Sequence, residues 1–194
     1  KLNKINIIVG YAKKKFNFKN VKYIHNTNYK KNNVLESLFF AKKDLFGNCV
    51  ISYSDIIFKS NIVKKLLSSK ADISIVVDTD WKKNYIGRLH HPFSEADKAY
   101  FDKNKNLVRV GKNLTIKQCN SEFIGMLKLN EKGCTIFKKY FDVVKKEYKS
   151  KKFITSKNIE KSYLTDFFVY LMKNKVKIKC IPIKSNWMEI DTPE

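Results

Sequence analysis

Turn-forming residues are scarce in this sequence of 194 residues, which contains three prolines and six glycines. It has no Ser/Gly-rich stretch and no internal repeat, so the sequence predicts a single domain over residues 1–194. No apolar run approaches the roughly 18–20 residues that a membrane-spanning helix needs, which excludes a transmembrane protein. The first residues also lack the apolar core and cleavage site of a signal peptide.

Cysteine is sparse too, and its four copies, Cys49, Cys119, Cys134 and Cys180, are scattered along the chain. No C-x-x-C pair occurs, and the three histidines do not complete a zinc-binding pattern. The sequence therefore favours a reducing compartment, and we expect a cytoplasmic protein.

Acidic residues are outnumbered, with 18 against 40 basic residues and a formal net charge of +22. Arginine is nearly absent from the basic set, because Arg88 and Arg109 are its only members. Nucleic-acid surfaces rely on arginine for bidentate and stacking contacts, and an A/T-rich genome would enrich lysine without selection for binding. We therefore favour an anionic small-molecule substrate over a nucleic-acid partner.

Short apolar segments alternate with amphipathic segments, as in an α/β domain with a mostly parallel, Rossmann-like sheet flanked by helices. The expected strands are residues 5–11, 21–25, 48–55, 71–78, 121–129 and 176–184, with a hairpin over 100–110. The expected helices are residues 32–47, 60–70, 130–148 and 158–173.

Three aspartates, Asp55, Asp78 and Asp191, follow expected strands, where open α/β sheets bind their ligands. Mg²⁺ prefers oxygen ligands and takes one or two carboxylates together with water and phosphate oxygens. A magnesium–nucleotide site is one interpretation of these residues. The alternative is that each aspartate closes a turn.

The segment NNVLES begins an expected helix with the side chains of Asn32, Asn33 and Ser37. These groups suit a base or a phosphate, but the segment taken alone favours an asparagine that caps the helix, with Ser37 buried.

Other polar and aromatic candidates have two interpretations each. Lys112 could pair with a phosphate or face water, and Glu122 could bind a cation or face water. Trp81, Tyr85 and Trp187 could stack on a base or surround an ammonium group, or they could cover the core. The glycine-rich phosphate loops and a Ser–His–Asp arrangement are absent from the sequence.

Several segments, in order, carry a family resemblance: IIVGY, YIHNTNYKKNNVLESLFFA, ISYSDIIF, ISIVVD, W-x3-Y-x2-R, a GK turn, EFIGMLKL and WMEIDTPE. This order resembles the small nucleotidyltransferases of the nucleotide-diphospho-sugar transferase fold. Within them it is most similar to the cytidylyltransferase branch that acts on phosphocholine or aminoalkylphosphonates, as linked to phosphoenolpyruvate phosphomutase.

The resemblance implies transfer of CMP from a nucleoside triphosphate, expected to be CTP, to a phosphocholine- or phosphonate-type acceptor, with release of pyrophosphate. It implies catalytic Mg²⁺ held by Asp55 and Asp191. The implied nucleotide pocket contains Asn32, Asn33, Ser37, Ser54 and Lys112, and the implied acceptor pocket contains Glu122, Trp187, Trp81 and Tyr85. A sugar-1-phosphate nucleotidyltransferase and a non-catalytic, lysine-rich nucleic-acid-binding module remain alternatives, and a homodimer is left open.

One departure from the family is large. Its first strand and the G-x-G-x-R loop that grips the triphosphate have no counterpart in this sequence. We therefore expect a domain truncated at its N-terminus, with an uncovered sheet edge beside the nucleotide site.

Overall fold

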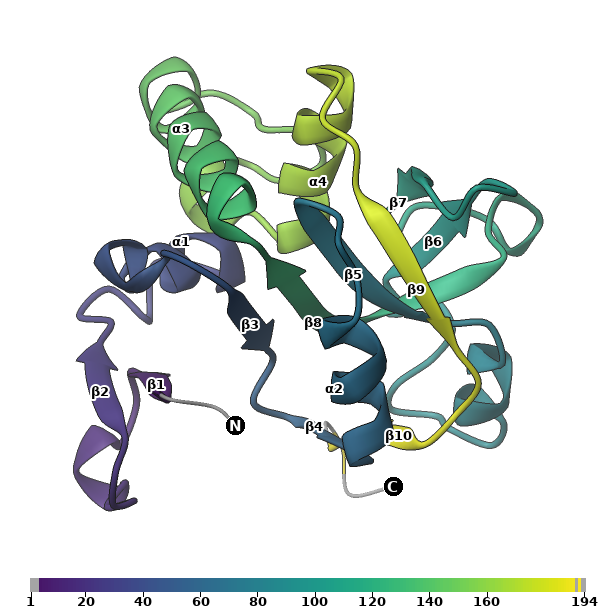
Figure 1. The fold of residues 1–194 in the computed structure, drawn as a ribbon, viewed down its shortest axis with the longest axis horizontal. Helices are drawn as coiled ribbons and strands as arrows, with labels where there is room; N and C mark the ends of the chain where they lie inside the picture. The colour runs from purple at the N-terminus through teal and green to yellow at the C-terminus, as the bar shows by residue number, and fades with distance from the viewer. Residues whose placement is uncertain (1–3, 191, 193–194) are drawn as a thin grey trace.

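Figure 1 shows the computed structural model, which describes residues 4–190 and residue 192. The strands are β1 (Asn6–Val9), β2 (Lys22–His25), β3 (Cys49–Ser52), β4 (Ile56–Phe58), β5 (Ile73–Asp78), β6 (Lys98–Phe101), β7 (Leu107–Val110), β8 (Ser121–Leu129), β9 (Lys179–Ile183) and β10 (Trp187–Glu189). The α-helices are α1 (Val34–Phe39), α2 (Ser60–Leu67), α3 (Glu131–Glu147) and α4 (Leu164–Lys173).

The main sheet is built around β8, whose nine residues are all buried. Its strand order is β7-β6-β8-β5-β9, and β3 also pairs with β8. The expected α/β class is confirmed, but the strand directions correct one detail. Only β9 runs parallel to its neighbour β5 in this sheet, whereas β8 pairs antiparallel with β3, β5 and β6.

Helices cover both faces of the main sheet, as the run of apolar residues in β5 predicts. On one face, Ile75 packs in a core with Phe137 of α3 and Phe167 of α4. On the other face, Val76 packs in a core with Leu66 of α2. Neighbouring residues of one strand thus point into two cores, which fixes the strand between its helix layers.

Two short sheets stand apart from the main sheet. β1 and β2 pair in parallel, and β4 pairs antiparallel with β10. In Figure 1 the β1–β2 pair lies beside the main body, on the side of α1 and β3. Among the described residues, the second edge of β1 and the second edge of β3 have no strand partner.

One edge of β8 is shared by two strands. β3 pairs with its last residues, from Met126, whereas β6 pairs with Ser121 and Glu122. Between them lies Gly125, with φ of +78°, and Tyr53 crosses directly over it. A Cβ atom at Gly125 would lie 2.4 Å from Tyr53 Cδ2, so only glycine lets Tyr53 approach this closely. The residues of β8 that lie between the two pairings, including Gly125, line the cavity described below.

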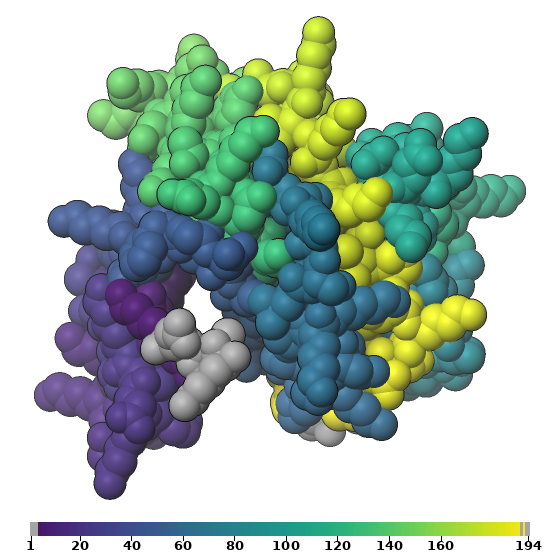
Figure 2. Space-filling model, viewed as in Figure 1, coloured from purple at the N-terminus to yellow at the C-terminus, as the bar shows by residue number. Residues whose placement is uncertain are grey.

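Figure 2 shows a deep opening between the N-terminal segment, in purple, and the rest of the molecule. Within the described ranges, none of the helices is long and apolar enough to cross a membrane.

Candidate functional site

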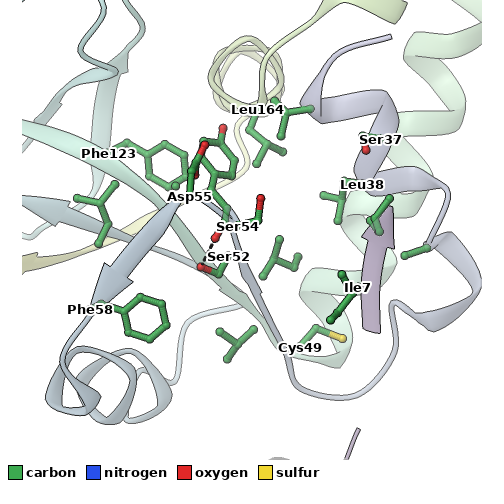
Figure 3. Close-up of a pocket in the computed structure, with 18 of the residues that line it drawn as sticks. Ile7, Ser37, Leu38, Cys49, Ser52, Ser54, Asp55, Phe58, Phe123 and Leu164 are labelled. Atoms are coloured by element: carbon green, nitrogen blue, oxygen red, sulfur yellow. Dashed lines mark hydrogen bonds between the residues drawn. The ribbon is translucent and has the colours of Figure 1, made fainter. Parts of the chain in front are cut away.

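A large cavity, with a volume of about 1650 Å³, lies between the β1–β2 pair and the main sheet. One side is apolar and contains residues of β1, α1 and β3, including Ile7, Leu38 and Ile51. The other side is polar and contains carboxylates from several elements. Figure 3 shows Ile7 and Leu38 opposite Asp55 and Ser54 across this space.

Asp55 lies between β3 and β4, on the polar side of the cavity. Its carbonyl oxygen accepts a hydrogen bond from Ile190 N–H at 2.8 Å, which continues the pairing of β4 with β10. Its Oδ1 atom is buried and has no hydrogen-bond partner among the described residues. The other expected metal ligand, Asp191, lies outside the described residues.

Four side chains form what we call the carboxylate recess: Asp97, Glu122, Tyr53 and Tyr85, all of which line the cavity. Glu122 is 3% exposed, and its Oε1 accepts a hydrogen bond from the Tyr85 hydroxyl. Glu122 Oε2, Asp97 Oδ1 and the Tyr53 hydroxyl are buried without a partner in the described part of the chain. The residues of the recess therefore carry buried polar atoms that no described residue pairs with.

Burial perturbs both acids of the recess. It raises the pKa of Glu122 to about 8, against the opposing effect of the Tyr85 hydrogen bond, and the negative charges of Glu189 and Asp97 add to the rise. Burial likewise raises the pKa of Asp97 to about 6, although Lys112 and Lys98 oppose the change. Perturbed carboxyl groups in a cavity are typical of functional sites.

Lys112 also lines the cavity, with its ammonium group 2.8 Å from Glu95 Oε2 and 5.2 Å from the centre of the Tyr163 ring. Burial alone would lower the pKa of Lys112, but the hydrogen bond to Glu95 and the charge of Asp97 raise it. The side chain is therefore a fixed positive charge at the cavity wall.

Asp78 has a structural role. Its Oδ2 accepts a hydrogen bond from Trp187 Nε1 at 2.7 Å, and its Oδ1 accepts from the backbone N–H groups of Asp80 and Ser185. The turn-closing alternative is thus what the structure shows for Asp78. Trp187 lines the cavity with its indole N–H already engaged.

The aromatic candidates differ in whether they line the cavity. Tyr85 lines the cavity, but Trp81 is 1% exposed and does not belong to the lining. Trp81 instead packs edge-on against Tyr85 and Phe93, with both centroid distances at 5.7 Å. Trp81 thus supports Tyr85 from behind, as the core-covering alternative predicts, and its contact with an acceptor stays a prediction.

The three candidates of the NNVLES segment also differ in whether they line the cavity. Asn33 caps α1 by accepting from Val34 N–H at 2.8 Å, and it lines the cavity together with Ser37. Asn32 is not among the lining residues, because its amide exchanges two hydrogen bonds with the Asn26 amide. The contact of Asn32 with a nucleotide stays a prediction. Ser54 lies in the lining.

Asp97 and Tyr53 were not expected from the sequence. Asp97 lies at the amino end of β6, whereas ligands of open α/β sheets are expected at the carboxyl ends of strands. Its proximity to β8 depends on the hydrogen bond from Phe123 N–H to its carbonyl oxygen, at 2.8 Å. That pairing joins residues far apart in sequence, so no local pattern indicated it.

No group of three or more His, Cys, Asp or Glu side chains gathers as a metal site within residues 4–190 and 192. The buried, unpaired Oδ1 of Asp55 is nevertheless an oxygen ligand of the kind that Mg²⁺ accepts. An ion that takes most of its ligands from water and phosphates fits a single carboxylate of this type.

No family model matches the chain. A curated relative, the CTP:phosphoglutamine cytidylyltransferase of Campylobacter jejuni, is 26% identical over 203 aligned positions, covering 98% of this chain and 78% of the relative.

Two solved structures are similar in fold. The inositol-1-phosphate CTP transferase from T. maritima matches with a TM-score of 0.65 and 16% identity, over 89% of this chain and 61% of that protein. The CTP:phosphocholine cytidylyltransferase from Streptococcus pneumoniae matches with a TM-score of 0.64 and 16% identity, over 99% of this chain and 75% of that protein. The chain thus spans less than two thirds of the T. maritima protein. The comparisons confirm the resemblance found in the sequence: the chain is a relative of cytidylyltransferases and has the nucleotidyltransferase fold.

Proposed function

We propose that this chain forms the greater part of a cytidylyltransferase that transfers CMP from CTP to a small phosphate- or phosphonate-bearing acceptor and releases pyrophosphate. The observation that supports the proposal is the cavity, whose lining includes Asp55, Lys112 and Glu122, in a chain with the nucleotidyltransferase fold. The named activities of the relatives support CTP as the donor.

Asp55 and Asp191 are the proposed ligands of Mg²⁺. When bound, the ion would neutralise negative charge on the triphosphate and so lower the barrier to attack. Asp55 suits this role because its unpaired buried oxygen is costly until a cation or donor meets it.

Lys112 is the proposed contact to a phosphate of the nucleotide. Its ammonium group can exchange part of its interaction with Glu95 for a phosphate oxygen, since both charges reach the cavity. The attacking phosphate oxygen is anionic at neutral pH, so the reaction needs positioning and charge stabilisation rather than a general base.

The nucleotide is proposed to occupy the side of the cavity lined by Asn33, Ser37 and Ser54. These side chains offer hydrogen-bond donors and acceptors to a base and a ribose. The Asn33 side chain already accepts from Val34 N–H and has its amide nitrogen 3.3 Å from Lys161 O. These two hydrogen bonds would hold the side chain in place beside the nucleotide.

The apolar side of the cavity is proposed to accept one more β-strand, supplied by polypeptide preceding Lys1. Its lining includes Ile7 and Ile8 of β1 and Val50 and Ile51 of β3, and both strands have an unpaired edge among the described residues. Unpaired edges of this kind accept a strand readily. Such a strand would join the β1–β2 pair to the main sheet.

All four thiols are free, as a reducing compartment requires, and this supports the proposal of a cytoplasmic enzyme.

The test is a pyrophosphate-release assay on the natural full-length protein with CTP and three acceptors: phosphocholine, aminoethylphosphonate and glucose 1-phosphate. We expect release with a phosphocholine- or phosphonate-type acceptor. If glucose 1-phosphate is the best of the three, the sugar-nucleotide alternative replaces the proposal. No release with any nucleoside triphosphate and any acceptor would refute a nucleotidyltransferase.

A further inference from the structure

Two of the four cysteines lie at one corner of the fold, where β8 leads into α3. Cys49 is the first residue of β3 and pairs with Leu129, the last residue of β8. Cys134 lies in the first turn of α3, and its N–H donates to Asn130 O, directly after β8, at 2.8 Å. The antiparallel pairing of β3 with β8 therefore brings together two cysteines that are far apart in the sequence.

The two thiol groups are neighbours. A hydrogen bond joins the side chains of Cys49 and Cys134. Both sulfur atoms also contact the turn before β3, since Cys49 Sγ lies 3.1 Å from Phe46 O and Cys134 Sγ lies 3.8 Å from Gly47 O. These two carbonyl groups belong to consecutive residues, so the sulfur atoms need no movement of a strand or helix to meet.

The start of α3 is fixed in place, which keeps Cys134 beside β3. The Asn130 side chain accepts from Gly133 N–H at 2.8 Å, and Asn130 Nδ2 donates to Asp72 Oδ1 at 3.0 Å. A Cβ atom at Gly133 would lie 2.0 Å from Asp72 O, so the helix approaches the segment before β5 as closely as only glycine allows. The proximity of the two thiols is therefore built into the packing of the core.

The two thiols differ in access and in acidity. Cys49 is half-buried and lines the cavity, whereas Cys134 is buried. The hydrogen bond with Cys134 lowers the pKa of Cys49 against the effect of burial, and the positive charge of Lys138 adds to the decrease. The same hydrogen bond, together with burial, raises the pKa of Cys134. An accessible, acidic thiol beside a second thiol is typical of cysteine pairs that respond to oxidants.

The other two cysteines have different surroundings. Cys180 is buried in β9, and this burial raises the pKa of its thiol to about 12. Burial also raises the pKa of Cys119, whose Sγ lies 3.4 Å from Ile116 O. Within the described ranges, neither of them is hydrogen-bonded to another thiol. They therefore provide controls within the same chain.

We propose that Cys49 and Cys134 form a redox-sensitive pair, which hydrogen peroxide converts into a disulfide between β3 and α3. This inference does not depend on the proposed function. A disulfide that forms only under oxidation and is reduced again by thiols is compatible with a reducing compartment.

The oxidation takes two steps. The Cys49 thiolate attacks one oxygen of the peroxide and breaks the O–O bond, so that Cys49 becomes a sulfenic acid. The other oxygen leaves as hydroxide and takes up the proton that Cys49 had released, which gives water. The Cys134 sulfur then attacks the Cys49 sulfur and breaks its S–O bond, and the hydroxyl group leaves as water with the Cys134 proton. Two thiols thus lose two electrons in total, and one peroxide is reduced to two waters.

The test treats the natural full-length protein, reduced beforehand, with hydrogen peroxide and maps its thiols by peptide mass spectrometry. We expect a peptide that links Cys49 to Cys134 within one molecule, and its loss after addition of dithiothreitol. The Cys49 thiol should disappear at least about tenfold faster than the Cys119 thiol, because it is the more acidic of the two. Cys134→Ser should stop the reaction at a Cys49 sulfenic acid that dimedone traps, and Cys49→Ser should leave Cys134 reduced. Cys119→Ser is the matched control and should leave the link unchanged.

The natural protein alone decides the outcome, so a serine variant that fails to fold does not affect it. Absence of the linked peptide under excess peroxide overturns the proposal, and so does equally fast oxidation of Cys49 and Cys119. A link that joins two molecules instead of one also overturns it. Because the linked peptide is measured and not pyrophosphate release, failure of the proposed cytidylyl transfer would leave this result unchanged.

Discussion

Trp187 Nε1 donates to Asp78 Oδ2 at 2.7 Å and so joins the end of β5 to the start of β10. Asp78 is fully buried, and two backbone N–H groups, of Asp80 and Ser185, also point at its carboxylate. The acid thus fixes the wall of the cavity without being placed to bind a ligand.

Asp78→Ala should lower the free energy of unfolding by about 3 kcal/mol or more, because three buried or half-buried donors lose their acceptor. Urea denaturation followed by tryptophan fluorescence measures the change. Asp80→Ala is the matched control, since Asp80 pairs with exposed Lys83 and its loss should cost less than about 1 kcal/mol. Equal losses in the two variants would contradict the role assigned to Asp78.

Asp55→Ala should abolish turnover of the full-length protein even with both substrates saturating, because it removes a proposed Mg²⁺ ligand that acts in the transition state. Pyrophosphate release measures the loss, which we expect to exceed about 10³-fold. Asp142→Asn, which changes an exposed aspartate of α3, serves as the surface control. Activity within tenfold of the natural protein would remove Asp55 from the metal site.

Glu122→Gln should change the pH dependence of stability. Glu122 has its pKa raised from 4.5 to about 8 in the folded chain, so the folded state holds the proton more tightly than the unfolded state. Its contribution is therefore complete below about pH 4.5 and is lost as the pH rises toward 8, by an amount of the order of a few kcal/mol. We expect Glu122→Gln to be more stable than the natural sequence at pH 9 and nearly equal to it at pH 5. Thermal unfolding at both pH values measures this, and a pH-independent difference would contradict the raised pKa.

The open edges of β1 and β3 should make the N-terminal part of this 194-residue chain the least protected region. Hydrogen exchange followed by mass spectrometry should show peptides of β1 and β2 exchanging at least ~100-fold faster than those of β5, whose six residues are all buried. We also expect the isolated chain to aggregate, since an uncovered edge accepts strands from other copies. A monomer that unfolds in one transition, with β1 and β5 equally protected, would contradict the proposal that the groove accepts another strand.

The strands and helices that could be predicted are those with a recognisable pattern within one continuous segment of sequence. The largely apolar segment 121–129 predicted β8 with its observed bounds, Ser121–Leu129, because a strand buried on both faces is mostly apolar. β4 and β10 were not predicted as a pair, since each has three residues and their pairing joins Phe58 to Trp187. The direction of β8 relative to its neighbours also depends on such distant pairing.

The site shows the same division. Asp55 was found because it follows a strand, and Glu122 because it precedes an apolar run. Asp97 was missed because its place beside Glu122 depends on the pairing of β6 with β8. Trp81 had two interpretations because sequence alone does not tell whether an aromatic residue in a loop faces a cavity or the core behind it, and the structure buries its ring.

The close contact of Tyr53 with Gly125 restricts which residues can replace this glycine. Lysine, asparagine and isoleucine, which are abundant in this sequence, have A/T-rich codons, whereas glycine codons are G/C-rich. At Gly125, any replacement would place a Cβ atom 2.4 Å from the Tyr53 ring and force a positive φ on a residue that resists it. Tyr53 is one of the four residues of the carboxylate recess. A substitution of Gly125 would therefore disturb the proposed substrate site as well as the packing of the sheet.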